Sequence, residues 1–395
     1  MLKPSPYAWI SQYFIGFFFA YGVYLPFWAL WLKDQGISAG DIGILLGLAF
    51  ATRCVANLVI TPRIHKVEHL IPTLRILSVA SAFFIAFHLV TGGNFWLLVV
   101  ATILFNLCCG PAIPLSDALT NYYSRLRMLD YGRTRLWGSI AFILGSTVVG
   151  FLVAQFGIQM IVFTALFGVL LSIALSLRSP TTLPVTAEQN KAVRPRLSLL
   201  MRDRAVIKFL ILVALIQCSH AAYYGFSSIY WKDAGYSADV IGYLWSLGVA
   251  AEVCIFALSN RLFGGWTLRS LFLVASVGVV IRWGLTASTT LLPALVFIQM
   301  LHGVTFALAH IAAIRYIQNS EPNRMVALQA LYNAIPLGIV MAAMTTLSGW
   351  GYEYWGVNIF WGMALMGVVA MFIKLKVPQS EESHSEVEPT AQKST

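Results

Sequence analysis

The sequence predicts an all-α membrane protein whose twelve membrane-spanning helices form two six-helix bundles. Apolar residues make up 58% of the 395 residues and charged residues only 11%, whereas an ordinary soluble domain has roughly 25% charged residues. The heptapeptide Lys33–Ala39 (KDQGISA) returns 199 residues later as Lys232–Ala238 (KDAGYSA). A repeat at half the chain length indicates two related halves. Duplicated halves built from membrane helices are typical of secondary transporters.

A membrane-spanning helix needs about 20 consecutive, mostly apolar residues. Twelve windows meet this requirement, six on each side of a polar stretch from Arg178 to Arg204. Because the first window is long and lacks a small-residue cleavage site, we expect an uncleaved helix rather than a signal peptide. The windows are residues 7–31, 40–61, 72–92, 95–121, 134–156, 158–177, 206–231, 239–260, 267–288, 291–317, 325–348 and 355–373.

These windows divide the chain into four parts. Residues 1–177 are expected to form the N-terminal six-helix bundle and residues 205–377 the C-terminal one. A cytoplasmic linker at 178–204, with three prolines and scattered charge, joins them. Residues 378–395 are acidic and polar, as is typical of a disordered tail. We expect prolines to kink three helices: the first at Pro26, the fourth at Pro111 and Pro114, and the eleventh at Pro336.

The net charge of +10 is distributed unevenly. Loops on the side of the N-terminus carry the basic residues, and the opposite loops carry only Lys33 and Lys232. The positive-inside rule therefore places both termini in the cytoplasm. The charge is explained by the lipid bilayer, and we expect no nucleic-acid partner. Trp31 and Trp231, near helix ends, are expected in the aromatic belts at the membrane surface.

Nothing in the sequence indicates enzymatic chemistry. The five cysteines lie in apolar windows without the spacing of metal ligands, so we interpret them as small apolar side chains and expect no metal site. The sequence has neither a nucleotide-binding glycine-rich motif nor a nucleophile elbow. We therefore predict no catalytic residues and no cofactor, and the sequence disfavours transport driven by ATP.

Four segments resemble known transporters. They are Tyr21–Trp28 (YGVYLPFW), Asp130–Ser139 (DYGRTRLWGS), His220–Ser227 (HAAYYGFS) and Tyr243–Gly248 (YLWSLG). In these segments the chain resembles the phenylpropionate:proton symporter family, the bacterial 3-phenylpropionate permeases of the major facilitator superfamily. It resembles the lactose permease and other sugar or nucleoside proton symporters more distantly. The resemblance implies uptake of a small molecule with protons across the cell inner membrane, by a protein that we expect to act as a monomer.

Charged residues inside membrane-spanning helices are costly and indicate a functional site. Five lie within the predicted helices: Arg53, Asp117, Arg135, Glu252 and Arg282. Because the three arginines outnumber the two acids, the balance favours an anionic substrate.

Asp117 and Arg135 lie 18 residues apart across the hairpin of the fourth and fifth helices. A guanidinium can bind a carboxylate or two hydroxyls through paired hydrogen bonds, and a neighbouring carboxylate can hold it in position. The pair resembles the residues with which the lactose permease holds its sugar, which implies direct contact with the substrate. The alternative is a salt bridge that staples the hairpin or gates the cavity near its cytoplasmic end.

Arg53 and Glu252 occupy equivalent positions in the two halves, because they are separated by the repeat offset of 199. Opposite charges at these positions could meet across the interface and separate during transport, although equivalent positions need not touch. The cost of burying either charge indicates a functional role, and we assign both residues to proton coupling.

His302 and Arg282 resemble, by position, the tenth-helix histidine and ninth-helix arginine of the lactose permease. The resemblance implies a role in coupling for His302, and we place Arg282 at the substrate. One turn after the histidine, where the lactose permease has its coupling glutamate, this chain has Thr305. Glu252 is then the best candidate for the proton carrier, since burial disfavours a charged carboxylate, and histidine is the alternative. His310 is interpreted as structural.

The first and seventh helices carry aromatic residues at helical spacing. Tyr21, Tyr24, His220 and Tyr224 lie mid-helix, where an interfacial belt does not explain them. They suit a cavity that stacks on a flat apolar ring and offers hydrogen-bond donors. The predicted substrate site therefore comprises Tyr21, Tyr24, Asp117, Arg135, His220, Tyr224 and Arg282.

The leading hypothesis is a proton-coupled importer of a small aromatic carboxylate such as 3-phenylpropionate, working by alternating access. A proton-coupled sugar or nucleoside symporter is an alternative, because Asp117 and Arg135 could also hold hydroxyls. A drug efflux pump or a non-transporting membrane sensor is the alternative of another class. Gly145-Ser146-Thr147 in the fifth helix lacks the proline that efflux pumps of the superfamily often have, and the cytoplasmic segments are short for a signalling domain.

Overall fold

The computed structural model describes residues 3–64, 66–185 and 200–375, and the regular elements in these ranges are all helices. The first half contains α1 (Pro6–Asp34), α2 (Ala39–Val59), η1 (Thr61–Arg63), η2 (Val67–His69), α3 (Leu70–Phe87), η3 (His88–Val90), α4 (Phe95–Cys109), α5 (Ala112–Arg125), α6 (Tyr131–Phe156) and α7 (Met160–Ser176). The second half contains α9 (Arg204–Cys218), α10 (Ala221–Asp233), α11 (Ala238–Phe263), α12 (Leu268–Ser288), α13 (Leu292–Met300), η4 (Gly303–Leu308), α14 (Ala309–Gln318), α15 (Pro322–Ala334), η5 (Ile335–Val340), α16 (Met341–Trp355), η6 (Gly356–Asn358) and α17 (Ile359–Met371).

Twelve stretches of this chain cross the molecule. Ten helical stretches of the described residues are long and apolar enough to span a membrane, and Met160–Ser176 is a shorter apolar helix. The longest stretch, Arg324–Met371, contains two crossings, because the chain turns at Gly356 between α16 and α17. The predicted fold class is therefore confirmed. Since an even number of crossings returns the chain to its starting side, α1 begins and α17 ends on one side, here called the terminal side; the opposite one is the far side.

The repeated heptapeptide forms the same turn on the far side of each half. Gly36 follows α1 and Gly235 follows α10, with φ angles of 82° and 94°. Glycine adopts this left-handed conformation without strain. Ser38 and Ser237 then occupy the N-cap positions of α2 and α11. The shared sequence therefore specifies a shared turn.

Prolines interrupt the regular α-helix in two of the three crossings where we expected kinks. Pro111 separates α4 from α5, and Pro114 lies in the first turn of α5. Pro336 lies in η5, a π-helical turn between α15 and α16, where a residue without an N–H removes a helical hydrogen bond. The first crossing differs, because α1 continues through Pro26 as one helix of 29 residues.

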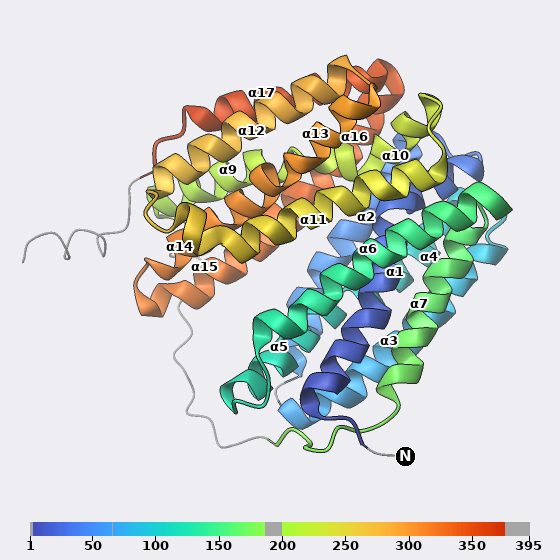
Figure 1. The fold of residues 1–395 in the computed structure, drawn as a ribbon, viewed down its shortest axis with the longest axis vertical. Coiled ribbons are helices and arrows are strands. Elements are labelled where there is room, and N and C mark those ends of the chain that lie inside the picture. The colour runs from blue at the N-terminus through green and yellow to red at the C-terminus, as the bar shows by residue number, and fades with distance from the viewer. Residues whose placement is uncertain (1–2, 65, 186–199, 376–395) are drawn as a thin grey trace, which may run out of the picture.

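The crossings form two bundles, α1–α7 and α9–α17 (Figure 1). The bundles contact each other through α2 with α16, α6 with α11, and α1 with α10. In Figure 1 they meet at the upper right, near α2, α10 and α16, and diverge toward the lower left, where α5 and α15 lie apart. The divergence is toward the terminal side.

Contacts on the far side hold the two bundles together. Lys33 Nζ lies 2.7 and 2.8 Å from the two carboxylate oxygens of Asp233. The Gly40 N–H, at the start of α2, donates to Glu353 Oε2 near the end of α16 (2.6 Å). The same two helices pack so closely that a Cβ on the glycine at 43 would come within 2.5 Å of the Cα of Gly349. The structure is therefore closed on its far side.

The described beginning of the predicted linker, residues 178–185, lies against the first bundle. Trp9 Nε1 donates to the carbonyl oxygen of Arg178 (2.7 Å), and the Tyr123 hydroxyl donates to that of Thr182 (2.6 Å). The remaining linker residues 186–199 and the predicted tail at 378–395 lie outside the described residues. The domain boundaries stay a prediction.

Trp31 and Trp231 are buried, with 1% and 0% of their surfaces exposed. Their expected place in an aromatic belt at the membrane surface is therefore wrong. The Trp31 ring packs on Trp28, with centroids 4.9 Å apart, and the Trp231 ring packs on Tyr223 at 6.1 Å. Both rings are thus buried inside the protein, where they remove a large apolar area from the surface.

Candidate functional site

A polar cluster around Arg53 lies inside the first bundle. Arg53 comes from α2, Tyr21 and Tyr24 from α1, and Asn106 from α4. Arg53 Nε donates to Asn106 Oδ1 (2.7 Å), and Arg53 Nη1 donates to the Tyr21 hydroxyl (3.2 Å). The guanidinium carbon also lies 5.2 and 5.3 Å from the ring centres of Tyr21 and Tyr24, which is within range of a cation–π interaction.

These partners of Arg53 are all neutral. The ion pairs found among the described residues do not include Arg53. Asn106 Nδ2 donates to the Tyr24 hydroxyl (3.3 Å) and to the Thr102 carbonyl (2.8 Å), which keeps the amide oxygen turned toward the guanidinium. A cation at this depth is costly without a carboxylate partner. An anion bound beside Arg53 would supply the opposite charge.

Arg53 also lies on the wall of a cavity between the two bundles. Phe50, one turn before it on α2, places its ring centre 5.9 Å from the guanidinium carbon. Tyr224 of α10 and Thr345 of α16 face them from the second bundle. A wall that is aromatic on both sides, with a cation on one side, suits a flat apolar ring that carries a carboxylate. The lining residues are Tyr24, Leu25, Leu46, Ala49, Phe50, Arg53, Tyr224 and Thr345.

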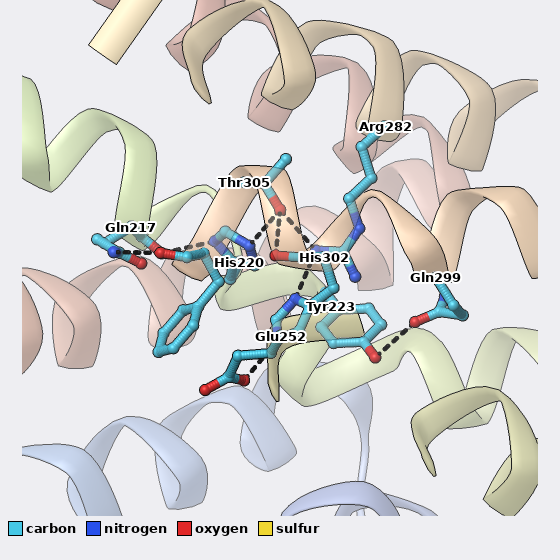
Figure 2. Close-up of polar contacts among 9 residues, drawn as sticks. Gln217, His220, Tyr223, Glu252, Arg282, Gln299, His302 and Thr305 are labelled. Atoms are coloured by element: carbon cyan, nitrogen blue, oxygen red, sulfur yellow. Dashed lines mark hydrogen bonds and ion pairs between the residues drawn. The ribbon is translucent and has the colours of Figure 1, made fainter. Parts of the chain in front are cut away.

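A second polar cluster lies inside the second bundle (Figure 2). Arg282 Nη1, from α12, lies 2.8 Å from His302 Nδ1 and 3.0 Å from Thr305 Oγ1. The Thr305 hydroxyl also lies 3.0 Å from Nε2 of His220, the residue before α10. Figure 2 shows these side chains pointing toward one another. Thr305 belongs to η4, a π-helical turn, and such turns occur frequently at functional sites.

The chemistry of the donors fixes the direction of this network. A guanidinium can only donate, so His302 Nδ1 accepts and neutral His302 carries its proton on Nε2. His220 Nδ1 lies 3.0 Å from the carbonyl oxygen of Gln217, which can only accept, so neutral His220 carries its proton on Nδ1. The Thr305 hydroxyl therefore accepts from Arg282 and donates to His220. These tautomers are inferred from the hydrogen-bond partners.

Glu252 of α11 lies at the end of the network. Its Oε2 is 3.6 Å from His302 Nε2, so the histidine stands between the carboxylate and Arg282 (Figure 2). The Glu252 side chain is 24% exposed, whereas Arg282 is fully buried. Glu252 is therefore the acid of this network that solvent can reach.

Arg282 packs against two rings that also contact each other, with their centres 5.7 Å apart. Its guanidinium carbon lies 4.6 Å from the ring centre of Tyr223 and 4.4 Å from that of Trp283. The Tyr223 hydroxyl donates to Gln299 Oε1 (2.8 Å). Arg282 does not line the cavity between the bundles, whereas Arg53 does. The roles expected from the sequence, Arg282 at the substrate and Arg53 in coupling, stay predictions.

Asp117 of α5 and Arg135 of α6 are close together, as their spacing predicted. Arg135 Nε lies 3.9 Å from Asp117 Oδ1, with the two side chains 33% and 27% exposed. The guanidinium carbon lies 4.2 Å from the ring centre of Phe18. A loose, partly exposed pair stacked on a ring fits contact with a ligand as well as a gate.

The two clusters occupy repeat-equivalent positions. The acid–base pair considered between Arg53 and Glu252 is not formed, because Arg53 binds Asn106 and Tyr21 while Glu252 faces His302. Each half thus builds its polar cluster from its own helices. Four residue pairs are related by the offset of 199: Tyr21 and His220, Tyr24 and Tyr223, Arg53 and Glu252, Asn106 and Thr305.

Sequence reasoning missed several members of the site. The repeat offset applied to Tyr24 would have indicated Tyr223, and Phe50 precedes Arg53 by one helical turn on the same face. Gln299 and Thr345 carry no such signal, because their place depends on how helices pack. Tyr224, which the sequence predicts at the substrate site, lines the cavity between the bundles, and its ring stacks on His220 with centres 5.8 Å apart.

The chain is similar to membrane transporters over almost its whole length. The model of a family described as the MFS_1 like family matches residues 7–363. A probable 3-phenylpropionic acid transporter of Escherichia coli (strain K12) is 42% identical over 94% of this chain and 98% of the relative. A maltose permease of Geobacillus stearothermophilus is 24% identical over 93% of this chain and 94% of the relative. A crystal structure of the nucleoside transporter NupG has a TM-score of 0.77 at 16% identity, with 93% of this chain and 97% of that one covered, which shows a shared fold.

Proposed function

The chain belongs to the MFS_1 like family and is a membrane transporter, not an enzyme; from this premise we propose that it imports a small aromatic carboxylate together with protons. The relative that is 42% identical is described as a probable 3-phenylpropionic acid transporter. The aromatic cavity beside Arg53 supports the same substrate class for this chain, and the network that ends at Glu252 supports proton coupling.

The substrate class is inferred from the surroundings of Arg53. The hydrogen bonds of this arginine use Nε and Nη1, so Nη2 and the second hydrogen of Nη1 remain, and we assign them to the two oxygens of a carboxylate, the strong bidentate arrangement. The substrate ring then lies between Phe50 and Tyr224. Asp117 and Arg135 provide a second contact or a gate.

Glu252 is the proposed proton carrier. Protonating His302 on Nδ1 would set two donors against each other, because Arg282 already donates to that nitrogen. Proton exchange therefore falls to the carboxylate, which lies 3.6 Å from His302 Nε2 and is partly exposed. A protonated Glu252 accompanies the bound substrate, and its deprotonation accompanies release.

The geometry also supports a transport cycle within one chain. The substrate cavity lies between the two bundles of a single molecule, so a monomer suffices. We place the terminal side in the cytoplasm and the protein in the cell inner membrane, because the basic loops lie on that side. The bundles of residues 1–177 and 205–377 then rock about the cavity between them to give alternating access, and the far-side contacts break when the terminal side closes.

Uptake into proteoliposomes tests this proposal. With an acidic exterior, wild-type protein should accumulate labelled 3-phenylpropionate, and a protonophore should abolish accumulation. Arg53→Gln serves as the matched binding-defective control. Accumulation of labelled maltose or uridine instead would make the chain a sugar or nucleoside symporter. This is the alternative function, because the hydrogen-bonding groups of Asp117 and Arg135 could also bind hydroxyls. Uptake that is independent of the pH gradient would exclude proton coupling.

A further inference from the structure

We propose that Thr305 is a positioning residue for proton coupling: its hydroxyl orients Arg282 so that His302 presents the Nε2 proton to Glu252. The inference rests on the proposed function, in which Glu252 carries the proton, and it assigns a role to a side chain that touches neither substrate nor carrier. Thr305 is fully buried. Its hydroxyl lies 3.0 Å from both Arg282 Nη1 and His220 Nε2.

The rings around Arg282 do not determine its orientation alone. Tyr223 and Trp283 contact the guanidinium, with ring centres 4.6 and 4.4 Å from its carbon, but a ring contact does not select one nitrogen over another and leaves the rotation of the guanidinium open. Its Nε and Nη2 have no hydrogen-bond partner among the described residues. The rotation is therefore set by Nη1, which donates to His302 and to Thr305.

A hydroxyl is required at this position because it must accept and donate at once. Arg282 needs an acceptor, and His220 Nε2 needs a donor, since the other nitrogen of His220 already donates to the Gln217 carbonyl. A methyl group in place of the hydroxyl leaves a buried cation and a buried ring nitrogen each short of one hydrogen bond. The guanidinium can then turn away from His302, and the His302 proton is no longer fixed on Nε2.

The titratable groups around His302 come from every neighbouring element. Glu252 faces its Nε2 from α11, and Arg282 faces its Nδ1 from α12. The ring centres of His220 and Tyr223 lie 5.4 and 5.9 Å from the ring centre of His302. His310, on α14, stacks on the ring of Phe306, which in turn stacks on His302. A change in the pH dependence of accumulation in a Thr305 variant is therefore assigned to this group of residues as a whole and not to His302 alone.

Two substitutions separate the hydroxyl from the shape of the side chain. Thr305→Val keeps the shape and removes the hydroxyl, whereas Thr305→Ser keeps the hydroxyl. Thr120→Val is the matched control, because Thr120 is also fully buried and its hydroxyl donates to the Ser116 carbonyl of its own helix (2.7 Å). Each variant is reconstituted and assayed for counterflow of 3-phenylpropionate and for accumulation driven by a pH gradient.

We expect Thr305→Val to retain counterflow within about twofold and to lose accumulation by about tenfold or more, since the loss of one hydrogen bond to a charged group corresponds to a factor of at least about ten. Its accumulation should also show a shifted pH profile. Thr305→Ser and Thr120→Val should behave like wild type. Full accumulation by Thr305→Val, or equal losses in Thr305→Val and Thr305→Ser, would overturn the proposal.

A spectroscopic measurement tests the same inference without transport. Nitrogen-15 NMR of histidine-labelled wild-type protein, with His302→Gln to assign the signal, should show His302 at neutral pH with Nδ1 unprotonated and Nε2 protonated. The same tautomer should persist in Thr305→Ser. A proton on Nδ1 of wild-type His302 would overturn the inference even if Thr305→Val fails to fold. If the tautomer is as expected but no aromatic carboxylate is transported, the proposed function fails and the positioning role stands.

Discussion

Lys33 and Asp233, the first residue of one heptapeptide copy and the second residue of the other, bind each other across the two bundles. Lys33 Nζ lies 2.7 and 2.8 Å from the carboxylate oxygens of Asp233. The reciprocal pair, Lys232 with Asp34, is not among the ion pairs of the described residues. Because the two paired side chains are 44% and 51% exposed, the pair is a weak latch.

Reversing one charge of this latch should shift the protein toward a state open on the far side. An exposed ion pair contributes at most about 1 kcal/mol, so we expect Lys33→Asp to change the conformational equilibrium by about fivefold. The exchange of both residues, Lys33→Asp with Asp233→Lys, should restore it. Spin labels at Gln155 and Ser288, at the far-side ends of α6 and α12, report the distance between the bundles.

Lys232→Asp is the control for the latch. This substitution makes the same charge change in the other heptapeptide copy, so it should leave the distance distribution close to that of wild type. Equal shifts from Lys33→Asp and Lys232→Asp would show that surface charge, rather than the pair, controls the equilibrium.

Removing the guanidinium of Arg53 should weaken binding of the substrate carboxylate specifically. A bidentate hydrogen-bonded ion pair is worth about 2–3 kcal/mol, so Arg53→Gln should raise the Kd for 3-phenylpropionate by about 30- to 150-fold. Calorimetry on the purified protein measures this change, with the uncharged amide of 3-phenylpropionate as the control ligand. Equal losses for acid and amide would mean that Arg53 shapes the cavity without binding the carboxylate.

Glu252→Gln should still exchange substrate across the membrane but should no longer accumulate it against a gradient. The glutamine mimics the protonated carboxyl, so the loaded protein can still change conformation, and counterflow should be retained. Accumulation against a gradient should be lost, because no proton is released. Both are measured in the same vesicles. Loss of counterflow would make Glu252 structural, and retained accumulation would assign the proton to His302 or Asp117.

Arg135→Lys should impair substrate binding about tenfold, because lysine keeps the charge but loses the planar fork that stacks on Phe18 at 4.2 Å. The KM for counterflow measures the effect, and Arg135→Ala should raise it further. If Arg135→Lys has a normal KM while Arg135→Ala does not, the residue supplies a point charge and the bidentate role is refuted.

Asp203, the N-cap of α9, should make stability depend on pH. Its carboxylate accepts from the Ala205 N–H (2.9 Å) and pairs with Arg324, and the hydrogen bond from Arg324 holds the pKa of Asp203 below its ordinary value. A lowered native pKa stabilises the fold above the unfolded pKa of about 3.9, and this stabilisation is lost as the pH falls through the native pKa.

Asp203→Asn keeps a good N-cap side chain and removes the charge. Its thermal midpoint in detergent should therefore lie below that of wild type at pH 7, and the difference should shrink as the pH falls through the lowered native pKa of Asp203. A difference that stays the same from pH 7 down to the acid unfolding of the protein would exclude the ion pair as its cause.

The crossings were predictable because apolar length is a local property of the chain. The same holds for the turn at Gly36 and for the break at Pro111, where one residue determines the backbone. The depth of Trp31 was not predictable, because the face that a helix turns toward its neighbours depends on packing between helices. The sequence placed this residue at the right end of α1 but on the wrong side of it.

The candidate site was predictable as a set of residues but not as an arrangement. The cost of a buried charge identified Arg53, Glu252 and Arg282 one by one. Which arginine faces a cavity depends on the rings that cover it: Tyr223 and Trp283 enclose Arg282, while the cavity between the bundles reaches Arg53. That difference depends on how whole helices are rotated about their axes, which cannot be deduced from the spacing of residues along the sequence.

The neutral surroundings of Arg53 have an electrical consequence for the proposed cycle. Three arginines and two ionised acids give the membrane interior one net positive charge. Protonation of Glu252 adds a second positive charge, and a bound carboxylate on Arg53 cancels it. The loaded and the empty carrier then cross the membrane with the same charge. One carboxylate with one proton is therefore electroneutral, so the membrane potential, worth about 2.3 kcal/mol per charge per 100 mV, neither drives nor opposes uptake.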